Sequence, residues 1–356
     1  MKNTCTFLLC LLIAIFSFAQ QNKATYLERV DTINNNIYNR FYEEKTGLYY
    51  ETTDSSKNEH PHSYLWPLCA LIQAANEAET AGSEAVHIQP VINAINQYYN
   101  TAPPTPGYQA YVTKEKQDSR FYDDNQWIAI AYLDAYNRTK KPFFLDKAKE
   151  IYRFMMTGFD TLSGGGLYWR EDKKTSKNTC SNGPGILVAL QLYRITHQQP
   201  YFDTALLLYK WVNTRLQSQE GLYYDAIRIP SLQIDSALYT YNTGTMLQAN
   251  ALLYEITNNK GYLQEAERIA AAAKDHFYKS NKLPGNYWFN AVLLRGYQEL
   301  YRIDHNKQQL QFFYDDAERI WTDERDANNL LGVHKAKSLI DQAAMMEIYG
   351  RLVEMM

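Results

Sequence analysis

The sequence Tyr136-Asn137-Arg138-Thr139 recurs twice along the chain, as Tyr193-Arg194-Ile195-Thr196 and as Tyr254-Glu255-Ile256-Thr257. The three threonines are 57 and 61 residues apart, and an alanine stands nine residues after each of them. Self-similarity at a fixed spacing of this size is typical of a repeat architecture. The chain is therefore expected to consist of units of about sixty residues.

Each unit is predicted to contain two helices. The second helix has apolar residues on one face, which in the first unit are Phe144, Ala148, Ile151, Tyr152 and Met155. The first helix is apolar nearly all round, as in residues 127–133, and such a helix is buried on all sides. Alternating buried and half-buried helices imply an inner and an outer ring. No polar capping repeats appear at the ends, so we predict an all-α (α/α)6 toroid with six inner and six outer helices.

The first nineteen residues have the pattern of a removable signal peptide. Lys2 precedes an apolar run from Phe7 to Phe18, which meets the small-x-small site Ser17-Phe18-Ala19. The run is too short for a membrane span, which needs roughly 20 residues. We predict an exported protein, periplasmic or secreted, with residues 1–19 as signal peptide. Residues 20–356 contain no Ser/Gly/Pro-rich linker and are predicted to form a single (α/α)6 catalytic domain.

Charge and cysteine content narrow the possible partners. The net charge of −3 and the lack of a basic stripe argue against nucleic acid and anionic membranes. Of the four cysteines, Cys5 and Cys10 lie in the predicted signal peptide. The remaining Cys69 and Cys180 are too few for a disulfide scaffold or a structural zinc site, and the sequence leaves open whether they pair. Metal-ligand spacings and phosphate-binding loops are absent, so no metal or cofactor is expected. We expect a monomer.

The loops place the functional site at one end of the ring. Connections within a unit are short, whereas those between units are long and share a Gly-Leu-Tyr motif. It occurs as Gly47-Leu48-Tyr49-Tyr50, Gly166-Leu167-Tyr168-Trp169 and Gly221-Leu222-Tyr223-Tyr224. Long loops on a rigid scaffold usually carry function. The site is therefore expected where the inner helices begin, an end that we call the rim.

Polar residues stand at equivalent rim positions, fifteen residues before each repeat threonine: Asp124, Ser181 and Asn242. Helix capping is an equally good interpretation of Ser181 and Asn242. Asp123 and Asp124 are different, because one carboxylate is enough for a cap. Glycosidic hydrolysis needs two carboxyl groups, one ionised and one protonated. The helix dipole favours the first form and a neighbouring charge the second, so we predict this pair to be catalytic.

The motifs together resemble glycoside hydrolase family 76 over about residues 26 to 350. The resemblance is carried by residues 122–127, by Gly164-Gly165-Gly166 with Trp169, by residues 177–184, and by residues 221–225 and 241–244. It implies an (α/α)6 toroid that cleaves α-1,6-mannosidic linkages in mannan with retention of configuration. The partner would then be a polysaccharide or oligosaccharide of α-1,6-linked mannose.

The resemblance also implies residue roles. Asp123 would be the nucleophile and Asp124 the general acid/base. The expected substrate-binding residues are Tyr122, Asn125, Trp169, Asn182, Tyr224, Asp225, Tyr241 and Asn242. Trp169, Tyr224 and Tyr241 would stack on sugar rings. Asn182, Asp225 and Asn242 would bind sugar hydroxyl groups. The sequence departs from the family pattern at Trp288-Phe289-Asn290-Ala291, where many relatives have Phe-Lys-Gly, which bears on substrate detail.

Two alternatives compete with this reading. The first is another sugar-active enzyme of this fold, of the unsaturated-glucuronyl hydrolase or epimerase type. An epimerase would need rim histidines, and a uronate enzyme an arginine cluster, for which Arg120 and Arg170 are the obvious candidates. The second is a non-catalytic glycan-binding protein, which would have no reason to keep two carboxylates together.

Overall fold

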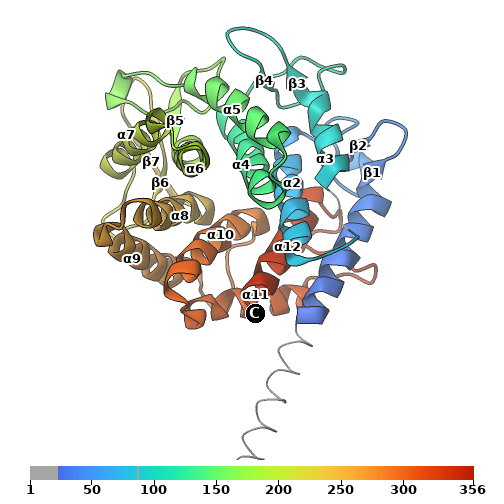
Figure 1. Ribbon diagram of the computed structural model, residues 1–356. Helices are drawn as coiled ribbons and strands as arrows, with labels where there is room; N and C mark the ends of the chain where they lie inside the picture. Colours follow the sequence, from blue (N-terminus) through green and yellow to red (C-terminus); the bar gives the residue numbers. More distant parts are fainter. Residues whose placement is uncertain (1–22, 86–87) are drawn as a thin grey trace, which may run out of the picture.

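The computed structural model describes residues 23–85 and 88–356, and its helices form two concentric rings (Figure 1). The inner ring consists of α2 (Leu65–Ala81), α4 (Tyr122–Thr139), α6 (Thr179–Thr196), α8 (Thr240–Thr257), α10 (Tyr287–Asp304) and α12 (Leu339–Glu354). Each inner helix contacts the next, and α12 packs against α2, which closes the ring. The outer ring consists of the helix over residues 23–41, α3 (Ile88–Ile95), α5 (Pro142–Met156), α7 (Gln199–Arg215), α9 (Lys260–Phe277) and α11 (Gln311–Asp323). This arrangement confirms the predicted (α/α)6 toroid.

Burial follows the predicted patterns. The first fourteen residues of α6 are all buried, as expected for a helix enclosed by its neighbours. The outer helix α5 buries one face only, through Phe144, Ala148, Ile151, Phe154 and Met155. Hydrophobic burial on both rings therefore holds the toroid together.

The repeat threonine ends each of three inner helices. Thr139 Oγ1 donates to the carbonyl oxygen of Ala135 (2.7 Å) and accepts the N–H of Lys141 (3.4 Å). Lys140 between them is left-handed, with φ 58°, and this reverses the chain into the outer helix. Thr196 and Thr257 repeat these contacts. The helix α10 ends in the same way with Asp304 in place of threonine, which explains why the sequence repeat did not reveal this fourth copy.

Short strands and 3-10 helices complete the loops. Two hairpins pair β1 (Tyr42–Glu43) with β2 (Leu48–Tyr49) and β3 (Tyr99–Asn100) with β4 (Gly107–Tyr108). A third, antiparallel sheet has the order β5 (Ser176–Asn178), β6 (Tyr224–Arg228), β7 (Ile234–Leu238). The 3-10 helices are Ser55–Lys57, Asn96–Tyr98, Leu162–Gly164 and Lys307–Leu310.

Charged pairs occupy the ring interior further from the rim. Arg295 Nη2 lies 2.7 Å from Asp134 Oδ2, which links α10 to α4. Arg351 on α12 contacts Glu77 of α2 (2.9 Å) and Glu347 of its own helix (2.7 Å). These arginines therefore neutralise the acids of the deep interior.

Two remaining predictions concern export and the cysteines. The predicted signal peptide, residues 1–19, lies outside the described residues, so its removal stays a prediction. In the ranges that the structure describes, no helix is long and apolar enough to cross a membrane. Cys69 and Cys180 are both buried free thiols, which answers the question of whether they pair.

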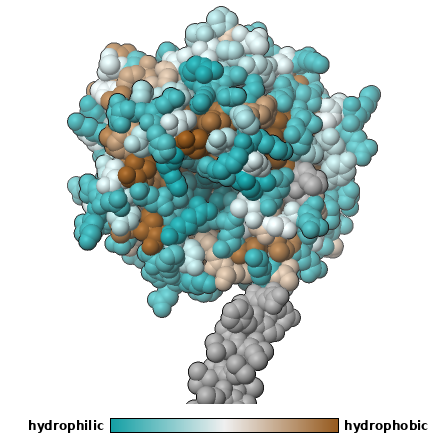
Figure 2. Space-filling model, in the orientation of Figure 1, coloured by the Kyte–Doolittle hydropathy of each residue, from teal (hydrophilic) through white to brown (hydrophobic). Residues whose placement is uncertain are grey.

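The face seen in Figure 2 is mostly hydrophilic, with separate hydrophobic patches around a hollow.

Candidate active site

Asp123 and Asp124 lie in the first turn of α4, at the rim. Both side chains are half-buried, on the floor of a cleft with a volume of about 770 Å³. Neither Ser181 nor Asn242, at the equivalent positions of α6 and α8, caps its helix. The residues before those helices are Asn178 and Tyr239, and neither forms a side-chain cap. The capping interpretation of Ser181 and Asn242 is therefore wrong.

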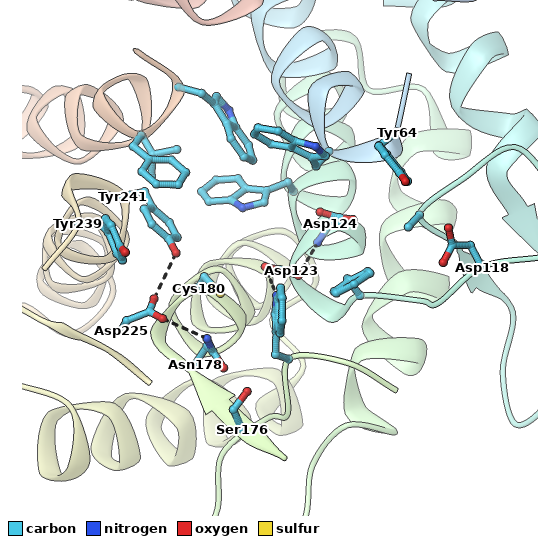
Figure 3. Close-up of a pocket in the computed structure, with 18 of the residues that line it drawn as sticks. Tyr64, Asp118, Asp123, Asp124, Ser176, Asn178, Cys180, Asp225, Tyr239 and Tyr241 are labelled. Atoms are coloured by element: carbon cyan, nitrogen blue, oxygen red, sulfur yellow. Dashed lines mark hydrogen bonds between the residues drawn. The ribbon is translucent and has the colours of Figure 1, made fainter. Parts of the chain in front are cut away.

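The cleft brings together residues from five of the inner helices and from the rim loops. Its lining comprises Tyr64, Trp66, Ala110, Lys116, Asp118, Phe121, Asp123, Asp124, Trp127, Trp169, Ser176, Asn178, Cys180, Asp225, Arg228, Tyr239, Tyr241, Trp288, Phe289 and Val292. In Figure 3, the two aspartates lie between Tyr64 and Asp118 on one side and Asp225, Tyr239 and Tyr241 on the other. The volume is in the range of small-molecule and glycan sites.

Asp123 is the more readily ionised carboxyl group of the pair. Burial raises its pKa to about 6, although hydrogen bonds from Cys180, Trp169 and the backbone oppose the shift. Trp169 Nε1 donates to Asp123 Oδ2 (3.0 Å), and the Asp124 N–H donates to Asp123 Oδ1 (3.1 Å). Hydrogen bonds to the charged form favour ionisation.

Asp124 retains its proton more strongly. Burial raises its pKa well above the ordinary value, and the charge of Asp123 raises it further. The two basic side chains that line the cleft pair with other acids: Lys116 with Asp118 (3.9 Å) and Arg228 with Asp235 (3.0 Å). The site thus holds one carboxylate and one carboxylic acid side by side.

Three of the predicted substrate-binding residues line the cleft: Trp169, Asp225 and Tyr241. The Asp225 carboxylate accepts long hydrogen bonds from Asn178 (3.4 Å), Tyr241 (3.4 Å) and Asn242 (3.3 Å). Charge-assisted hydrogen bonds usually measure about 2.7–2.9 Å. Asp225 therefore retains capacity to accept stronger hydrogen bonds from a ligand.

The other five predicted contacts do not line the cleft. Asn125 and Asn182 are fully buried, and each fixes the loop before its helix through both backbone groups of one residue. Asn125 bonds the N–H and carbonyl of Tyr108 (2.7 and 2.8 Å), and Asn182 those of Leu167 (2.7 and 3.0 Å). The prediction that these amides contact the substrate is therefore corrected: they position the rim loops.

Tyr122 and Asn242 are also corrected, because both side chains are fully buried, whereas Tyr224 is half-buried and stays a prediction. The Tyr122 ring is buried against Phe154, with its hydroxyl 3.2 Å from Thr157. Tyr224 is half-buried in β6, where its carbonyl accepts a hydrogen bond from Thr179 (2.6 Å). Asn242 is buried and reaches the cleft only through Asp225.

The cleft also has an aromatic wall, of which the sequence pointed only to Trp288 and Phe289, as a departure from the family pattern. The Trp288 ring lies 6.1 Å from Trp66 and 5.8 Å from Trp127, and Phe289 lies 4.0 Å from Tyr241. Trp66 follows a loop in the first unit, which lacks the Tyr-x-x-Thr repeat, so the sequence offered no register for it. Trp127 stood in the quoted motif, but its helical periodicity indicated only burial.

Comparisons with known proteins point to one family. A family model described as glycosyl hydrolase family 76 matches residues 25–312. A putative mannan endo-1,6-alpha-mannosidase of Schizosaccharomyces pombe is 24% identical over 249 residues, which is 66% of this chain and 54% of that protein. A mannan endo-1,6-alpha-mannosidase of Saccharomyces cerevisiae is 28% identical over 184 residues, 47% of this chain and 41% of that protein. The chain thus spans about half the length of these relatives.

Solved structures show the same fold. A family 76 mannosidase of Bacteroides thetaiotaomicron aligns with a TM-score of 0.83 and 26% identity, over 92% of this chain and 98% of the other. An inactive alpha-1,6-mannanase variant of Salegentibacter sp. HEL1_6, in complex with alpha-1,6-mannotriose, aligns with a TM-score of 0.80. Its identity is 20%, over 93% of this chain and 100% of the other. Because the family model extends from the first outer helix to α11 and includes the paired aspartates, this chain belongs to glycosyl hydrolase family 76.

Proposed function

We propose that this chain is a retaining glycoside hydrolase that cleaves α-1,6-mannosidic linkages in mannan or manno-oligosaccharides. The observation that carries the proposal is the placement of Asp123 and Asp124 side by side in one cleft, where burial raises both pKa values and the charge of Asp123 raises that of Asp124 further. Such a carboxylate and carboxylic acid are what glycosidic cleavage requires. The mannosidase names of the relatives supply the substrate class.

The proposed mechanism assigns one role to each aspartate. Asp123 attacks the anomeric carbon as a carboxylate, while Asp124 gives its proton to the departing glycosidic oxygen. Asp124, now ionised, takes a proton from the incoming water, which releases the sugar from Asp123. The higher pKa of Asp124 suits the proton donor, and the bonds from Trp169 and the backbone suit the nucleophile.

The cleft walls suggest how a mannose chain binds. Sugar rings stack on aromatic faces, which the wall of Trp66, Trp288 and Phe289 offers. Asp225, which Tyr241 links to Phe289 of this wall, supplies acceptor oxygens for hydroxyl groups. We therefore propose Trp169, Asp225 and Tyr241, together with this wall, as substrate contacts.

The uronate alternative finds little support in the arginines that suggested it. Arg120 is buried, pairs with Glu171 (2.5 Å) and donates to loop carbonyl groups. Arg170 pairs with Asp172 (2.8 Å). Neither lines the cleft, so neither is placed to bind a uronate carboxyl group.

Incubation of the purified protein with linear α-1,6-mannan and α-1,6-mannotetraose tests the proposal. We expect release of shorter α-1,6-manno-oligosaccharides, with retained anomeric configuration by proton NMR, and loss of at least about 100-fold in Asp123→Asn and Asp124→Asn. A folded protein that cleaves neither glycan would contradict the proposal, and unsaturated uronides would be tested next. Export, the monomeric state and independence of metals and cofactors stay predictions.

A further inference from the structure

The indole N–H of Trp169 forms a hydrogen bond with the carboxyl group of Asp123, the proposed nucleophile. Trp169 Nε1–H donates to Asp123 Oδ2 at 3.0 Å, within the normal range for such a bond. An indole N–H is a donor only, so it can stabilise the carboxylate of Asp123 but not accept a proton from it. A tryptophan there therefore favours one charge state of its partner.

The chain holds Trp169 firmly against the helix that carries Asp123. The backbone carbonyl of Trp169 accepts a hydrogen bond from the N–H of Tyr122, the first residue of α4 (3.0 Å). The backbone N–H of Trp169 donates to the carbonyl oxygen of Ser176 (3.1 Å). The indole ring lies 4.9 Å from the ring of Phe121. Backbone and ring contacts thus fix the donor relative to the carboxylate.

The internal repeat shows that this position is special to the catalytic unit. The fourth residue of the Gly-Leu-Tyr motif is Tyr50 in the first loop and Tyr224 in the third. The Tyr50 hydroxyl donates to Glu43 (2.8 Å), away from the cleft, and Tyr224 does not line the cleft. Only the loop that faces the aspartate pair has a tryptophan here.

We propose that Trp169 is a positioning residue, which orients the Asp123 carboxylate and keeps it ionised for attack on the substrate. This inference rests on the proposed function for its catalytic consequence, but the hydrogen bond itself can be tested without substrate. A simple stacking platform would use the ring face and would not need the N–H.

The first test observes the indole N–H directly. The chain has six tryptophans, so a nitrogen-15 spectrum contains six indole signals, and the one missing in Trp169→Phe belongs to Trp169. That signal should shift with pH around a midpoint of about 6, in step with Asp123, and the titration should vanish in Asp123→Asn. A Trp169 signal that responds neither to pH nor to Asp123→Asn would overturn the proposal, whether or not mannan is cleaved.

The second test separates positioning from stacking. Trp169→Phe, and the replacement of Trp169 by benzothienylalanine, which removes only the N–H, should lower kcat about 10- to 100-fold. KM should change less, and the acidic limb of the pH profile should move to higher pH. Trp288→Phe serves as a comparison for the pH profile alone: as a proposed substrate contact it should raise KM, but its Nε1 has no partner among the described residues, so the acidic limb should stay in place. A rise in KM alone, with kcat and the limb as in wild type, would overturn the positioning role.

Discussion

Two aspartates of one helix, Asp124 and Asp134, have opposite environments inside the ring. Asp134 lies ten residues further along α4, about 15 Å deeper at 1.5 Å per residue. There Arg295 pairs with it at 2.7 Å, in a layer where Arg351 likewise pairs with Glu77. Asp124 has instead a second aspartate beside it, and its pKa is raised well above the ordinary value. The same scaffold thus neutralises acids that support the fold and leaves uncompensated the pair that we propose to be catalytic.

The contrast explains what each acid costs the fold. Removing one partner of a buried ion pair strongly destabilises the folded protein, because the other charge stays buried without compensation. A carboxyl group with a raised pKa disfavours the folded state at neutral pH, because the unfolded chain ionises it more readily. Removing charge from the rim should therefore preserve or increase stability, whereas removing it from the deep layer should reduce stability.

Arg351→Met should have the largest effect on the deep layer. It leaves Glu77 and Glu347 buried without their cation, although burial already raises the Glu347 pKa. We expect the free energy of unfolding in urea to fall by about 3–5 kcal/mol. Adding Glu77→Gln and Glu347→Gln should recover part of this loss, and a loss below about 1 kcal/mol would show that the pairing is unimportant.

The second-largest effect should be the pH dependence of activity, which we expect to follow the ionisation of Asp123 at the rim. Asp123 must be ionised to attack, so activity should fall about tenfold per pH unit below about 6. Because the folded-state pKa is raised, the contribution of Asp123 to stability is most favourable at low pH and declines as pH rises through about 6. Initial rates between pH 4 and 8 measure the first effect. An acidic limb near pH 4, the ordinary range of a carboxyl group, would contradict the environment described here.

Replacing the side-chain amides that anchor loops should have a smaller effect on stability, and only one of the two replacements should affect activity. Asn182→Ala removes the hydrogen bonds to Leu167 and should lower stability by about 1–3 kcal/mol. Activity should fall too, because that loop carries Trp169. Gln342→Ala is the matched control, since Gln342 anchors Leu331 in the same way on a loop outside the cleft. It should lose similar stability while retaining kcat, and equal activity losses in both variants would refute the distinction.

Thr196→Ala should have the smallest effect. It removes the bond to the Leu192 carbonyl at the end of α6 away from the rim, so stability should fall by about 0.5–1.5 kcal/mol. Activity of the folded protein should equal that of wild type. Urea unfolding and initial rates measure both quantities, and a selective loss of kcat would mean that the helix end communicates with the cleft.

The fold could be predicted largely because its repeat has a local physical cause. Thr139, Thr196 and Thr257 each close a helix with contacts inside five residues, so the signal survives in the sequence. The aspartate pair could be predicted for the same reason, because Asp123 and Asp124 are adjacent both in the sequence and in the cleft.

The rest of the site depends on direction and on distant segments. Successive helix residues point about 100° apart, so Asp124 faces the cleft while Asn125 faces the loop. The resemblance to the family motifs does not distinguish side chains that face the cleft from those that face the loops, as Tyr122, Asn125 and Asn182 do. Tyr64 precedes α2 and Asp118 lies in the loop before α4, and neither belongs to a sequence motif that marked it for the cleft. Only closure of the ring brings them to the pair.

The most direct test compares Asp124→Asn with Glu77→Gln in urea unfolding at pH 7 and in kcat on α-1,6-mannotetraose. We predict that Asp124→Asn abolishes turnover with unchanged or increased stability, whereas Glu77→Gln loses stability but keeps its kcat. If Asp124→Asn were active, or were destabilised as much as Glu77→Gln, the division between a catalytic rim and a structural interior would be contradicted.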